Sequence, residues 1–430
     1  MKQGLARGAY SLLLRIATPL YLARLWWRGR QEPAYRQWWS ERLGRSDVSA
    51  APGRLWLHAV SLGETRAAVP LVDALRALRP DLCLLLTHGT ATGRDAGRAL
   101  LQAGDAQAWL PYDTPGAVRR FLQLHRPAVG VIMETEVWPN LLHAAKAAGV
   151  PLVLANARLS ERSENKGQRL AALMHPAMAC FAQVLAQTEA DAQRLRHSGA
   201  RNVQVTGNLK FDMTPRPDLL ARGQSWRRCS PRAVVLAAVT REGEEAPLLQ
   251  AWRQLPQPRP LLFIVPRHPQ RFDEVAALVE QAGFTLSRRS AWGDAAPSDS
   301  AADVWLGDSL GEMPAYYAAA DVALLGGSFA PLGGQNLIEA AACGCPLVMG
   351  PHTFNFAQAA ELALAAGAAW RVPGIEQGVR QAVALAANPE RPLLASRARA
   401  FAAEHRGAAA RMASQVLAFW PDEAAGRTGT

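Results

Sequence analysis

Glu64 is the first residue of the chain that is placed to do chemistry. It follows the apolar run LWLHAV (residues 55–60) and precedes a helical pattern, and Gly63 allows the sharp turn between them. This placement puts the carboxylate at the amino end of a helix. Spacing alone favours the interpretation that Glu64 only interacts favourably with the helix dipole, and a role in a binding cleft is the alternative.

Two more acids and a lysine occupy comparable positions. Glu134 and Glu136 come directly after the apolar run AVGVIM, and Trp138 follows them. Acids in such a place commonly bind a sugar or hold another side chain in position, so a site is predicted here. Lys210 follows the run VQVT, and its ammonium is suited to a phosphate or a carboxylate. A solvated lysine at a domain edge is the alternative.

Residues suited to anions recur in the second half of the chain. Arg267 lies between prolines after the apolar run LLFIV, and its planar guanidinium can bind two phosphate oxygens. Backbone N–H groups can approach an anion at three glycine-rich turns, residues 307–313, 326–328 and 333–336. Asn336 and Glu339 are three residues apart and share a face of the helix predicted after the last turn. Together these features predict a nucleotide-phosphate site.

The elements that must position these residues alternate regularly. Strands are predicted at 54–60, 82–87, 128–133, 151–155, 183–187, 203–206, 233–239, 261–265, 303–306, 321–326 and 346–349. Helices are predicted at 65–78, 91–102, 114–125, 140–148, 189–197 and 335–343, and a small, polar loop at 287–302. Continuous apolar strands that alternate with helices predict an α/β fold of doubly wound parallel sheets.

The pattern breaks at residues 213–232, which hold three prolines and a basic cluster and are predicted to be a linker. The predicted domains are a segment 1–50, a Rossmann-like acceptor domain 51–212, the linker 213–232, a second Rossmann-like domain 233–400, and a C-terminal helix and tail 401–430. Two such domains are expected to face a cleft at the carboxyl ends of their sheets, where ligands bind.

The first fifty residues are basic and rich in tryptophan. They hold nine Lys and Arg against three acidic residues, and four of the thirteen Trp, namely Trp26, Trp27, Trp38 and Trp39. Arg15, Pro19 and Arg24 interrupt the apolar stretch, so a spanning helix is not predicted. We expect an amphipathic anchor at an anionic membrane surface, with the Trp rings at headgroup level. A basic helix packed against the protein's own body is the alternative.

The composition and the motifs that are missing exclude several classes. The 430 residues are 49% hydrophobic and 19% charged, which argues against long disorder or a rod. Five scattered Cys argue against a disulfide scaffold and a zinc module. The net charge is +11, but no nucleic-acid-binding motif is found, so nucleic acid is not expected as a partner. Acids in one half and a phosphate site in the other indicate a nucleotide-sugar transferase.

In their order, these motifs resemble those of the bacterial 3-deoxy-D-manno-octulosonic acid (Kdo) transferases of lipopolysaccharide assembly. The similar stretch runs from about Tyr35 to Phe356 and includes HAVSLGE, METEVWPN, NARLSERS, GNLKFD, VPRHPQRF, GDSLGEM, GGSF and NLIEAAACGCPLVMGPHTFNF. The resemblance implies a GT-B fold and inverting transfer of Kdo from CMP-Kdo to the lipid A precursor lipid IVA. It further implies that the reaction uses no cofactor and no catalytic metal and takes place at the cytoplasmic face of the cell inner membrane.

The resemblance also assigns roles to residues. It makes Glu64 the general base that deprotonates the acceptor hydroxyl, and it makes Glu134 and Lys210 stabilisers of the transition state. The implied CMP-binding positions are Pro266, Arg267, Gly311, Glu312, Met313, Asn336, Leu337, Ile338 and Glu339. Such a reaction needs one base opposite the leaving group and needs stabilisation of the charge on the departing CMP.

Two positions depart from the family pattern. Val239-Thr240-Arg241 stands where the family usually has Ser-Thr-His, and Gln335 stands where it usually has His. Both positions belong to the half that is expected to bind the donor, so details of the donor site stay open. Two other functions also stay open. One is a GT-B transferase or epimerase that uses a UDP-sugar, and the other is a membrane-bound nucleotide-binding module without enzymatic activity.

Overall fold

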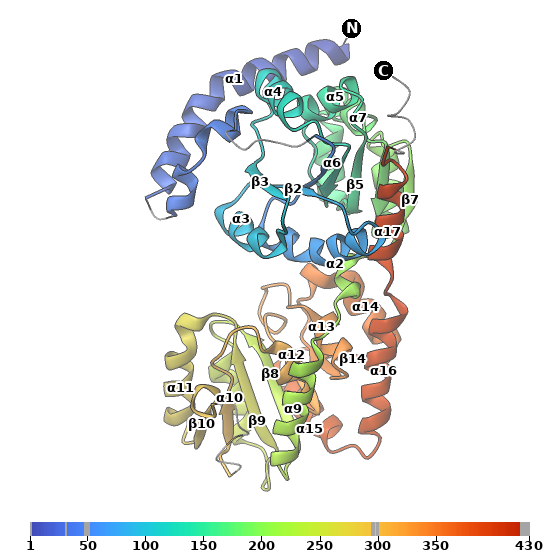
Figure 1. The fold of residues 1–430 in the computed structure, drawn as a ribbon. Coiled ribbons are helices and arrows are strands. Elements are labelled where there is room, and N and C mark those ends of the chain that lie inside the picture. Colours follow the sequence, from blue (N-terminus) through green and yellow to red (C-terminus); the bar gives the residue numbers. More distant parts are fainter. Residues whose placement is uncertain (1, 31, 47–51, 294–296, 298–300, 422–430) are drawn as a thin grey trace. The chain divides into compact units, whose positions relative to one another are not determined.

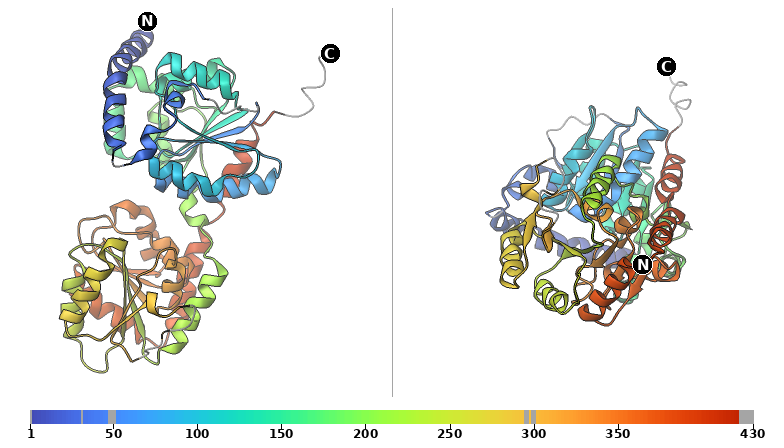
Figure 2. Two further views of the ribbon diagram at one scale, coloured as in Figure 1. Left: turned by 60° about the vertical axis from the view of Figure 1, so that its left-hand side comes forward. Right: turned by 90° about the horizontal axis from the view of Figure 1, so that it is seen from below.

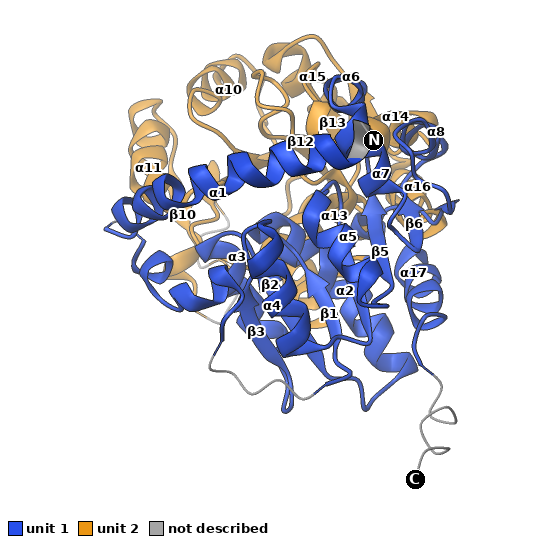
Figure 3. Ribbon diagram, turned by 90° about the horizontal axis from the view of Figure 1, so that it is seen from above, with its two compact units in different colours: residues 1–212, 406–430 blue, residues 213–405 orange. Residues whose placement is uncertain are grey.

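The computed structural model describes residues 2–30, 32–46, 52–293, 297 and 301–421 (Figure 1). The chain divides into two compact units, which are Met1–Asp212 together with Arg406–Thr430, and Met213–His405 (Figure 3). Each unit has its own sheet and its own hydrophobic cores. The predicted pair of doubly wound parallel sheets is confirmed.

The sheet of unit 1 has seven parallel strands in the order β3-β2-β1-β4-β5-β6-β7. The strands are β1 Leu55–His58, β2 Leu84–His88, β3 Ala106–Trp109, β4 Val129–Met133, β5 Leu152–Ala157, β6 Gln183–Ala186 and β7 Val203–Val205. Strand β1 pairs with both β2 and β4, so the chain starts near the centre and winds outward in both directions. Strand β3 was not predicted from the sequence, because its residues AQAW include two alanines, which have a low strand propensity.

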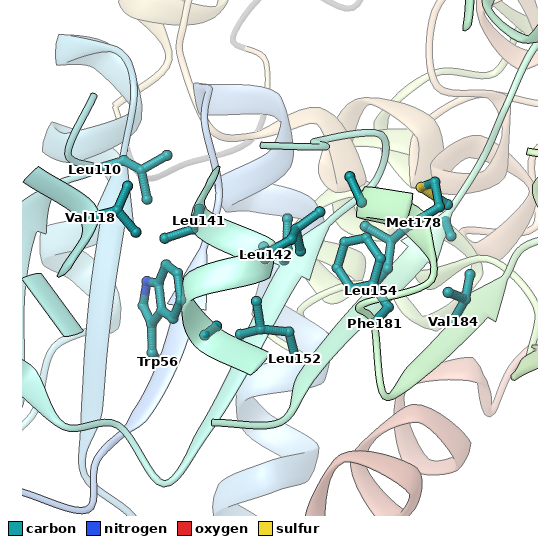
Figure 4. Packing of buried hydrophobic residues seen from close by; sticks show 14 of the residues in the cluster. Trp56, Leu110, Val118, Leu141, Leu142, Leu152, Leu154, Met178, Phe181 and Val184 are labelled. Carbon is teal, nitrogen blue, oxygen red and sulfur yellow. The ribbon is translucent and has the colours of Figure 1, made fainter. Parts of the chain in front are cut away.

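Helices cover both faces of this sheet. They are α1 Lys2–Arg28, α2 Leu62–Leu78, α3 Ala91–Gly97, α4 Pro115–His125, α5 Pro139–Ala147, α6 Glu161–Gln168, α7 Ala171–Met178, α8 Glu189–His197 and α17 Ala408–Leu417, with short 3-10 turns at 33–36, 39–43, 98–100 and 209–212. Successive side chains of a strand point to opposite faces. Trp56 therefore packs with Leu141 and Leu142 of α5 (Figure 4), whereas Leu55 and Leu57 pack with residues of α2 and α17.

Helix α1 has two different faces. Tyr10 donates a hydrogen bond to Asp113 at 3.0 Å, and Ser11 donates one to Asn140 at 3.1 Å, so one face packs on unit 1 as the alternative interpretation predicted. The opposite face exposes a set of large apolar side chains, Leu5, Leu12, Leu13, Ile16, Leu20 and Trp27. Among the described residues, every helix is too short or too polar to cross a bilayer.

The sheet of unit 2 also has seven parallel strands, in the order β10-β11-β9-β8-β12-β13-β14. The strands are β8 Val234–Thr240, β9 Leu261–Pro266, β10 Leu286–Arg288, β11 Val304–Leu306, β12 Val322–Leu325, β13 Leu347–Met349 and β14 Ala369–Arg371. The helices are α9 Pro217–Cys229, α10 Glu245–Arg253, α11 Phe272–Gln281, α12 Met313–Ala318, α13 Leu337–Ala342, α14 Ala357–Ala365, α15 Ile375–Ala386 and α16 Arg391–Glu404 (Figure 2).

The prediction that residues 213–232 form a linker between domains is wrong, because they belong to unit 2. Residues 213–232 contain α9, whose Pro217 occupies the first turn, where a proline does not interrupt the helix. Trp226 is buried, and Arg227 pairs with Asp321 at 3.0 Å, so α9 is an integral helix of unit 2.

The ends of two other predicted segments also differ. The predicted loop 287–302 begins with β10, and residues 294–296 and 298–300 lie outside the described part of the chain. In the predicted C-terminal segment 401–430, α16 ends in unit 2, whereas α17 returns to unit 1. Residues 1, 31 and 47–50 of the predicted segment 1–50, residue 51 of the predicted domain 51–212, and residues 422–430 of the predicted tail are likewise outside the described residues.

Candidate functional site

Glu64 lies in the first turn of α2, at the carboxyl end of β1. Its backbone N–H donates to the Ser61 hydroxyl at 3.4 Å, and its carboxylate accepts hydrogen bonds from the Ser61 hydroxyl at 3.1 Å and the Val60 N–H at 2.9 Å. The arrangement is a variant of a capping box, in which the N-cap Ser61 accepts from Glu64 N–H while the Glu64 carboxylate accepts from Val60 N–H instead of from the N-cap N–H. Glu64 therefore helps to start helix α2, as the interpretation based on spacing predicted. The same hydrogen bonds hold its half-buried carboxylate in one position.

The surroundings of Glu64 also favour proton transfer near neutral pH. Burial raises the pKa of Glu64 to about 7, and the charges of Glu134 and Glu136 add to the rise, against the opposing hydrogen bond from Val60. A carboxyl group with such a pKa can both accept and release a proton at physiological pH. Glu134 and Glu136 follow β4, which pairs with β1, so their charges are near enough to the end of β1 to affect the pKa of Glu64.

Glu134 has a strained backbone. Its φ is 60°, in the left-handed region that residues other than glycine rarely adopt, and its N–H donates to Ala155 of β5 at 2.9 Å. Strain of this kind costs about 1–3 kcal/mol and is found most often at functional sites. Burial and the charge of Glu134 raise the pKa of neighbouring Glu136.

Lys210 belongs to the same group of residues. It lies in the 3-10 turn Leu209–Asp212, directly after β7. Burial lowers the pKa of Lys210, the charge of Glu134 opposes this change, and Arg158 adds to it. Of the three residues predicted to be catalytic, Glu134 lies near enough at the carboxyl edge of this sheet for its charge to act on both Glu64 and Lys210.

Asn156 and Gln187, which help to position Lys210, were not among the site residues predicted from the sequence. The Asn156 side chain accepts a hydrogen bond from Leu209 N–H at 3.1 Å, and its backbone carbonyl accepts one from Gln187 at 2.9 Å. Gln187 in turn accepts from the Asn208 amide at 2.9 Å, and Asn208 accepts from Lys210 N–H at 3.0 Å. Asn156 lies within the NARLSERS motif and Asn208 within the GNLKFD motif, so these two motifs were the available signals for the network.

In unit 2, cations gather where β8 and β9 end. The Arg267 side chain is exposed and donates a hydrogen bond to Gln335, and its backbone N–H donates to Thr240 at 3.0 Å. Burial and the charges of Arg241, Arg267 and Arg271 lower the pKa of His268, which shows that the potential here is positive. Arg271 forms an ion pair with buried Glu245 at 2.7 Å, which fixes its guanidinium on that carboxylate.

Glu312 is held in a buried ion-pair network. Arg289 donates to both of its oxygens at 3.0 Å, Arg222 donates at 2.6 Å, and the Ser309 hydroxyl donates as well. These contacts lower the pKa of Glu312 against the opposing effect of burial. The carboxylate is thus committed to protein partners, and only the backbone of Glu312 is left for contact with a ligand.

The other predicted CMP-binding positions fall into two groups. Leu337 and Ile338 are fully buried and Pro266 is buried at the end of β9, so their side chains belong to the core. Gly311 is exposed with a φ of 80°, and Met313, Asn336 and Glu339 are half-buried. Asn336 begins α13, accepting a hydrogen bond from Ile338 N–H at 3.2 Å.

Val239, one of the residues that differ from the family pattern, has a strained backbone. Its φ is 57°, an unusual value for a β-branched residue, and the strand register shifts between Ala238 and Thr240. A Cβ at Gly326 would lie 2.3 Å from the Val239 carbonyl oxygen, so only glycine fits there. Glu244 accepts hydrogen bonds from Gly327 N–H at 2.8 Å and from Arg241 N–H at 2.9 Å, and so ties the two loops together.

Among the residues that the structure describes, no three His, Cys, Asp or Glu side chains form a group that could hold a metal ion. The charged groups of both sites are instead organised around carboxylates, arginines and one lysine. Such a set can accept a proton, bind an anionic ligand and stabilise developing charge.

The chain is similar in sequence to known glycosyltransferases. The family model described as 3-Deoxy-D-manno-octulosonic-acid transferase (kdotransferase) matches residues 37–213. The 3-deoxy-D-manno-octulosonic acid transferase of Bordetella pertussis is 50% identical over 424 residues, covering 95% of this chain and 98% of the relative. That of Haemophilus influenzae is 36% identical over 358 residues, covering 81% and 83%.

Two solved structures share the architecture. Anabaena HepE in complex with UDP aligns with a TM-score of 0.56 and 17% identity, covering 85% of this chain and 99% of that one. A glycosyltransferase from Rickettsia africae aligns with a TM-score of 0.57 and 11% identity, covering 87% and 100%. At such identities the likeness concerns the fold, which is the GT-B arrangement of two parallel seven-stranded sheets with flanking helices.

Proposed function

Because this chain belongs to the 3-deoxy-D-manno-octulosonic acid (Kdo) transferase family and is a glycosyltransferase, we propose that it moves Kdo from CMP-Kdo to the lipid A precursor lipid IVA and releases CMP. The observation that carries the proposal is the group formed by Glu64, Glu134 and Lys210. It offers a fixed carboxylate with a pKa near 7 beside one further acid and one cation.

In the proposed reaction, Glu64 accepts the proton of an acceptor sugar hydroxyl. The hydroxyl oxygen forms a bond to the anomeric carbon of Kdo as the bond from that carbon to the phosphate oxygen of CMP breaks. The electron pair of the broken bond stays on the phosphate, and the anomeric configuration inverts. Glu134 and Lys210 stabilise the transition state, in which charge is redistributed between sugar and phosphate.

Residues of unit 2 are proposed to bind the CMP group. Arg267 is the strongest candidate for a phosphate contact because its side chain is exposed, lies in a positive environment and carries a guanidinium that can bind two phosphate oxygens. Gly311, Met313, Asn336 and Glu339 are proposed to contact CMP directly. Glu312, Leu337 and Ile338 are proposed to contribute through their backbone, since their side chains are engaged in the ion-pair network or the core. We expect no cofactor and no catalytic metal in this reaction.

The protein is proposed to act at the cytoplasmic face of the cell inner membrane. The apolar face of α1 is exposed, with Leu20 74% and Trp27 70% accessible, and Arg15 and Arg24 of the same helix are exposed as well. A helix with this pattern lies in the plane of the interface, with its apolar residues among the acyl chains and its cations near anionic headgroups. At this location the enzyme can reach a lipid acceptor that lies in the membrane.

The test is a reaction of the purified protein with CMP-Kdo and lipid IVA in mixed micelles, followed by mass spectrometry of the lipid. Lipid IVA carrying Kdo, together with released CMP, is expected, and Glu64→Gln should bind CMP-Kdo without forming this product. Transfer from a UDP-sugar instead would contradict the proposed donor. Donor binding by the unaltered protein without any product would support the non-enzymatic module.

A further inference from the structure

A cavity in unit 1 lies beside the proposed catalytic group and has no part in the mechanism above. Its volume is about 350 Å³, which is within the usual range for small-ligand sites. Thr135 and Val137, which flank Glu136 on the loop after β4, form part of its wall. Arg158, whose charge acts on Lys210, forms another part.

Much of the cavity is built by the NARLSERS motif and the two helices after it. Arg158, Leu159 and Ser163 of the motif line the cavity, together with Lys166 of α6 and Met174 of α7. Asn156 of the motif positions Lys210, but the proposed reaction gives no task to the residues from 158 to 163. Binding of a ligand in this cavity would give these residues a function.

The lining is divided by polarity. The buried floor consists of Leu154, Met178 and Leu195, and Met174 is half-buried above it. The exposed lining residues are Leu170 and a polar set, namely Thr135, Arg158, Ser163 and Lys166, so the mouth is mainly polar. Methionine side chains adapt easily to flexible apolar ligands. The cavity therefore suits a molecule with an apolar chain and an anionic head.

The charges at the mouth are available to such a head group. Neither Arg158 nor Lys166 forms an ion pair with any residue that the structure describes, in contrast to nearby Arg194, which pairs with Asp191 at 3.1 Å. Arginine binds phosphate or carboxylate oxygens in pairs, and lysine binds them as a point charge.

We propose that this cavity, here called the acyl pocket, binds one acyl chain of the anionic glycolipid acceptor, with Arg158 and Lys166 contacting its negatively charged groups. The volume of about 350 Å³ is many times that needed for one water molecule, so the cavity has room for part of an acyl chain. Because Thr135 and Val137 belong to the loop that carries Glu134 and Glu136, a lipid seated here has its sugar beside the proposed catalytic group. The inference rests on the proposed function, since it identifies how the acceptor is held.

Binding is tested first without turnover. Dodecyl phosphate is titrated into the full-length protein by calorimetry, with inorganic phosphate and dodecyl maltoside as separate probes. Dodecyl phosphate should bind at least tenfold more tightly than either of the other two. Met174→Trp, which fills the pocket, should weaken it at least tenfold, whereas Ala172→Trp on an exposed position of the same helix should not change it.

Turnover is tested next with two acceptors, lipid IVA and its deacylated derivative. Met174→Trp should lower the ratio of kcat/KM for the acylated over the deacylated acceptor at least tenfold, and Ala172→Trp should leave the ratio unchanged. Leu170 is 59% exposed and lines the pocket, so Leu170→Asp should fold normally and lower the same ratio, with Gln168→Asp as its control.

The two proposals fail in different ways. If the protein transfers no Kdo to either acceptor, the proposed function fails, and dodecyl phosphate binding still reports on the pocket. An unchanged dodecyl phosphate affinity in both Met174→Trp and Leu170→Asp would overturn the acyl pocket while leaving transfer intact. Equal affinity for inorganic phosphate and dodecyl phosphate would also overturn the acyl pocket, because the dodecyl chain would then contribute nothing to binding.

Discussion

The side-chain oxygen of Asn156 accepts a hydrogen bond at 3.1 Å from the backbone N–H of Leu209, the residue that precedes Lys210. Asn156 is fully buried and adopts a φ of 52°, a conformation that asparagine tolerates better than most residues. Lys210 N–H donates to Asn208, which Gln187 holds in turn. One buried amide thus connects the end of β5 with the turn that carries the proposed catalytic cation.

Replacing Asn156 by Ala should therefore lower both stability and activity. The Leu209 N–H would lose its buried acceptor, which costs about 1–3 kcal/mol of unfolding free energy. Displacement of Lys210 should reduce kcat about tenfold or more, with little change in the KM for CMP-Kdo. Urea denaturation and steady-state kinetics measure the two effects. Asn202→Ala, which removes an exposed hydrogen bond to Ala182, is the matched control and should change neither strongly.

The pH dependence of transfer should report the ionisation of Glu64. The base must be deprotonated, and burial with the charges of Glu134 and Glu136 raises its pKa to about 7. The value of kcat/KM should consequently fall about tenfold per pH unit below that pKa. Glu136→Gln removes one of the negative charges that raise the pKa, so the acid limb should move to lower pH. Exposed Glu189→Gln should leave the limb in place, and an unmoved limb in Glu136→Gln would argue against Glu64 as the titrating base.

Arg267 and Gln335 should act together on donor binding. Loss of one charge-assisted hydrogen bond costs about 1.5–3 kcal/mol, so Arg267→Ala should raise the KM for CMP-Kdo at least tenfold. Gln335→His restores the residue usual in the family and keeps an acceptor for Arg267, so its effect should be under threefold. Arg380→Ala, which removes a long and exposed pair with Glu376, serves as the control. Unchanged donor affinity in Arg267→Ala would remove Arg267 from the phosphate site.

The sequence was sufficient to predict the sheets and the positions of Glu64 and Glu134. Buried parallel strands read as continuous apolar runs, and the residues that follow such runs must gather at one edge of a sheet. Short strands with alanine, such as β3 and β14, carry no such pattern and were missed. Helix α9 was also missed, because its prolines stand at the first turn and just after the helix.

Contacts between distant positions could not be predicted in the same way. Asn156 reaches Leu209 across 53 positions, and Arg267 reaches Gln335 across 68. Such pairs depend on how strands and loops assemble, which periodicity does not encode. The same applies to Glu312, whose two arginine partners come from α9 and from the turn after β10.

Glu312 should prove to be structural. Breaking a buried ion pair by removing one partner costs about 3–5 kcal/mol, because the other charge stays buried. Glu312→Ala would leave Arg289, itself buried, without its carboxylate. A loss of this size in urea denaturation is expected, with Glu376→Ala at an exposed pair as the control. A donor KM that rises in Glu312→Ala without a loss of stability would instead indicate direct contact with CMP.

The apolar face of α1 should govern binding to anionic bilayers. Ile16 and Leu20 are 64% and 74% exposed, so Ile16→Glu with Leu20→Glu should leave the fold intact. Each substitution removes apolar area worth about 1.5–3 kcal/mol when fully buried in lipid, and the double variant should bind at least a hundredfold more weakly. Sedimentation with vesicles of phosphatidylethanolamine and phosphatidylglycerol measures the loss, with Gln377→Glu and Gln381→Glu on α15 as a matched control. Raising the salt concentration should weaken the unaltered protein's binding as well, because the arginines of α1 contribute about 1 kcal/mol each near an anionic surface. Equal sedimentation of the double variant and the unaltered protein would show that α1 is not the membrane contact.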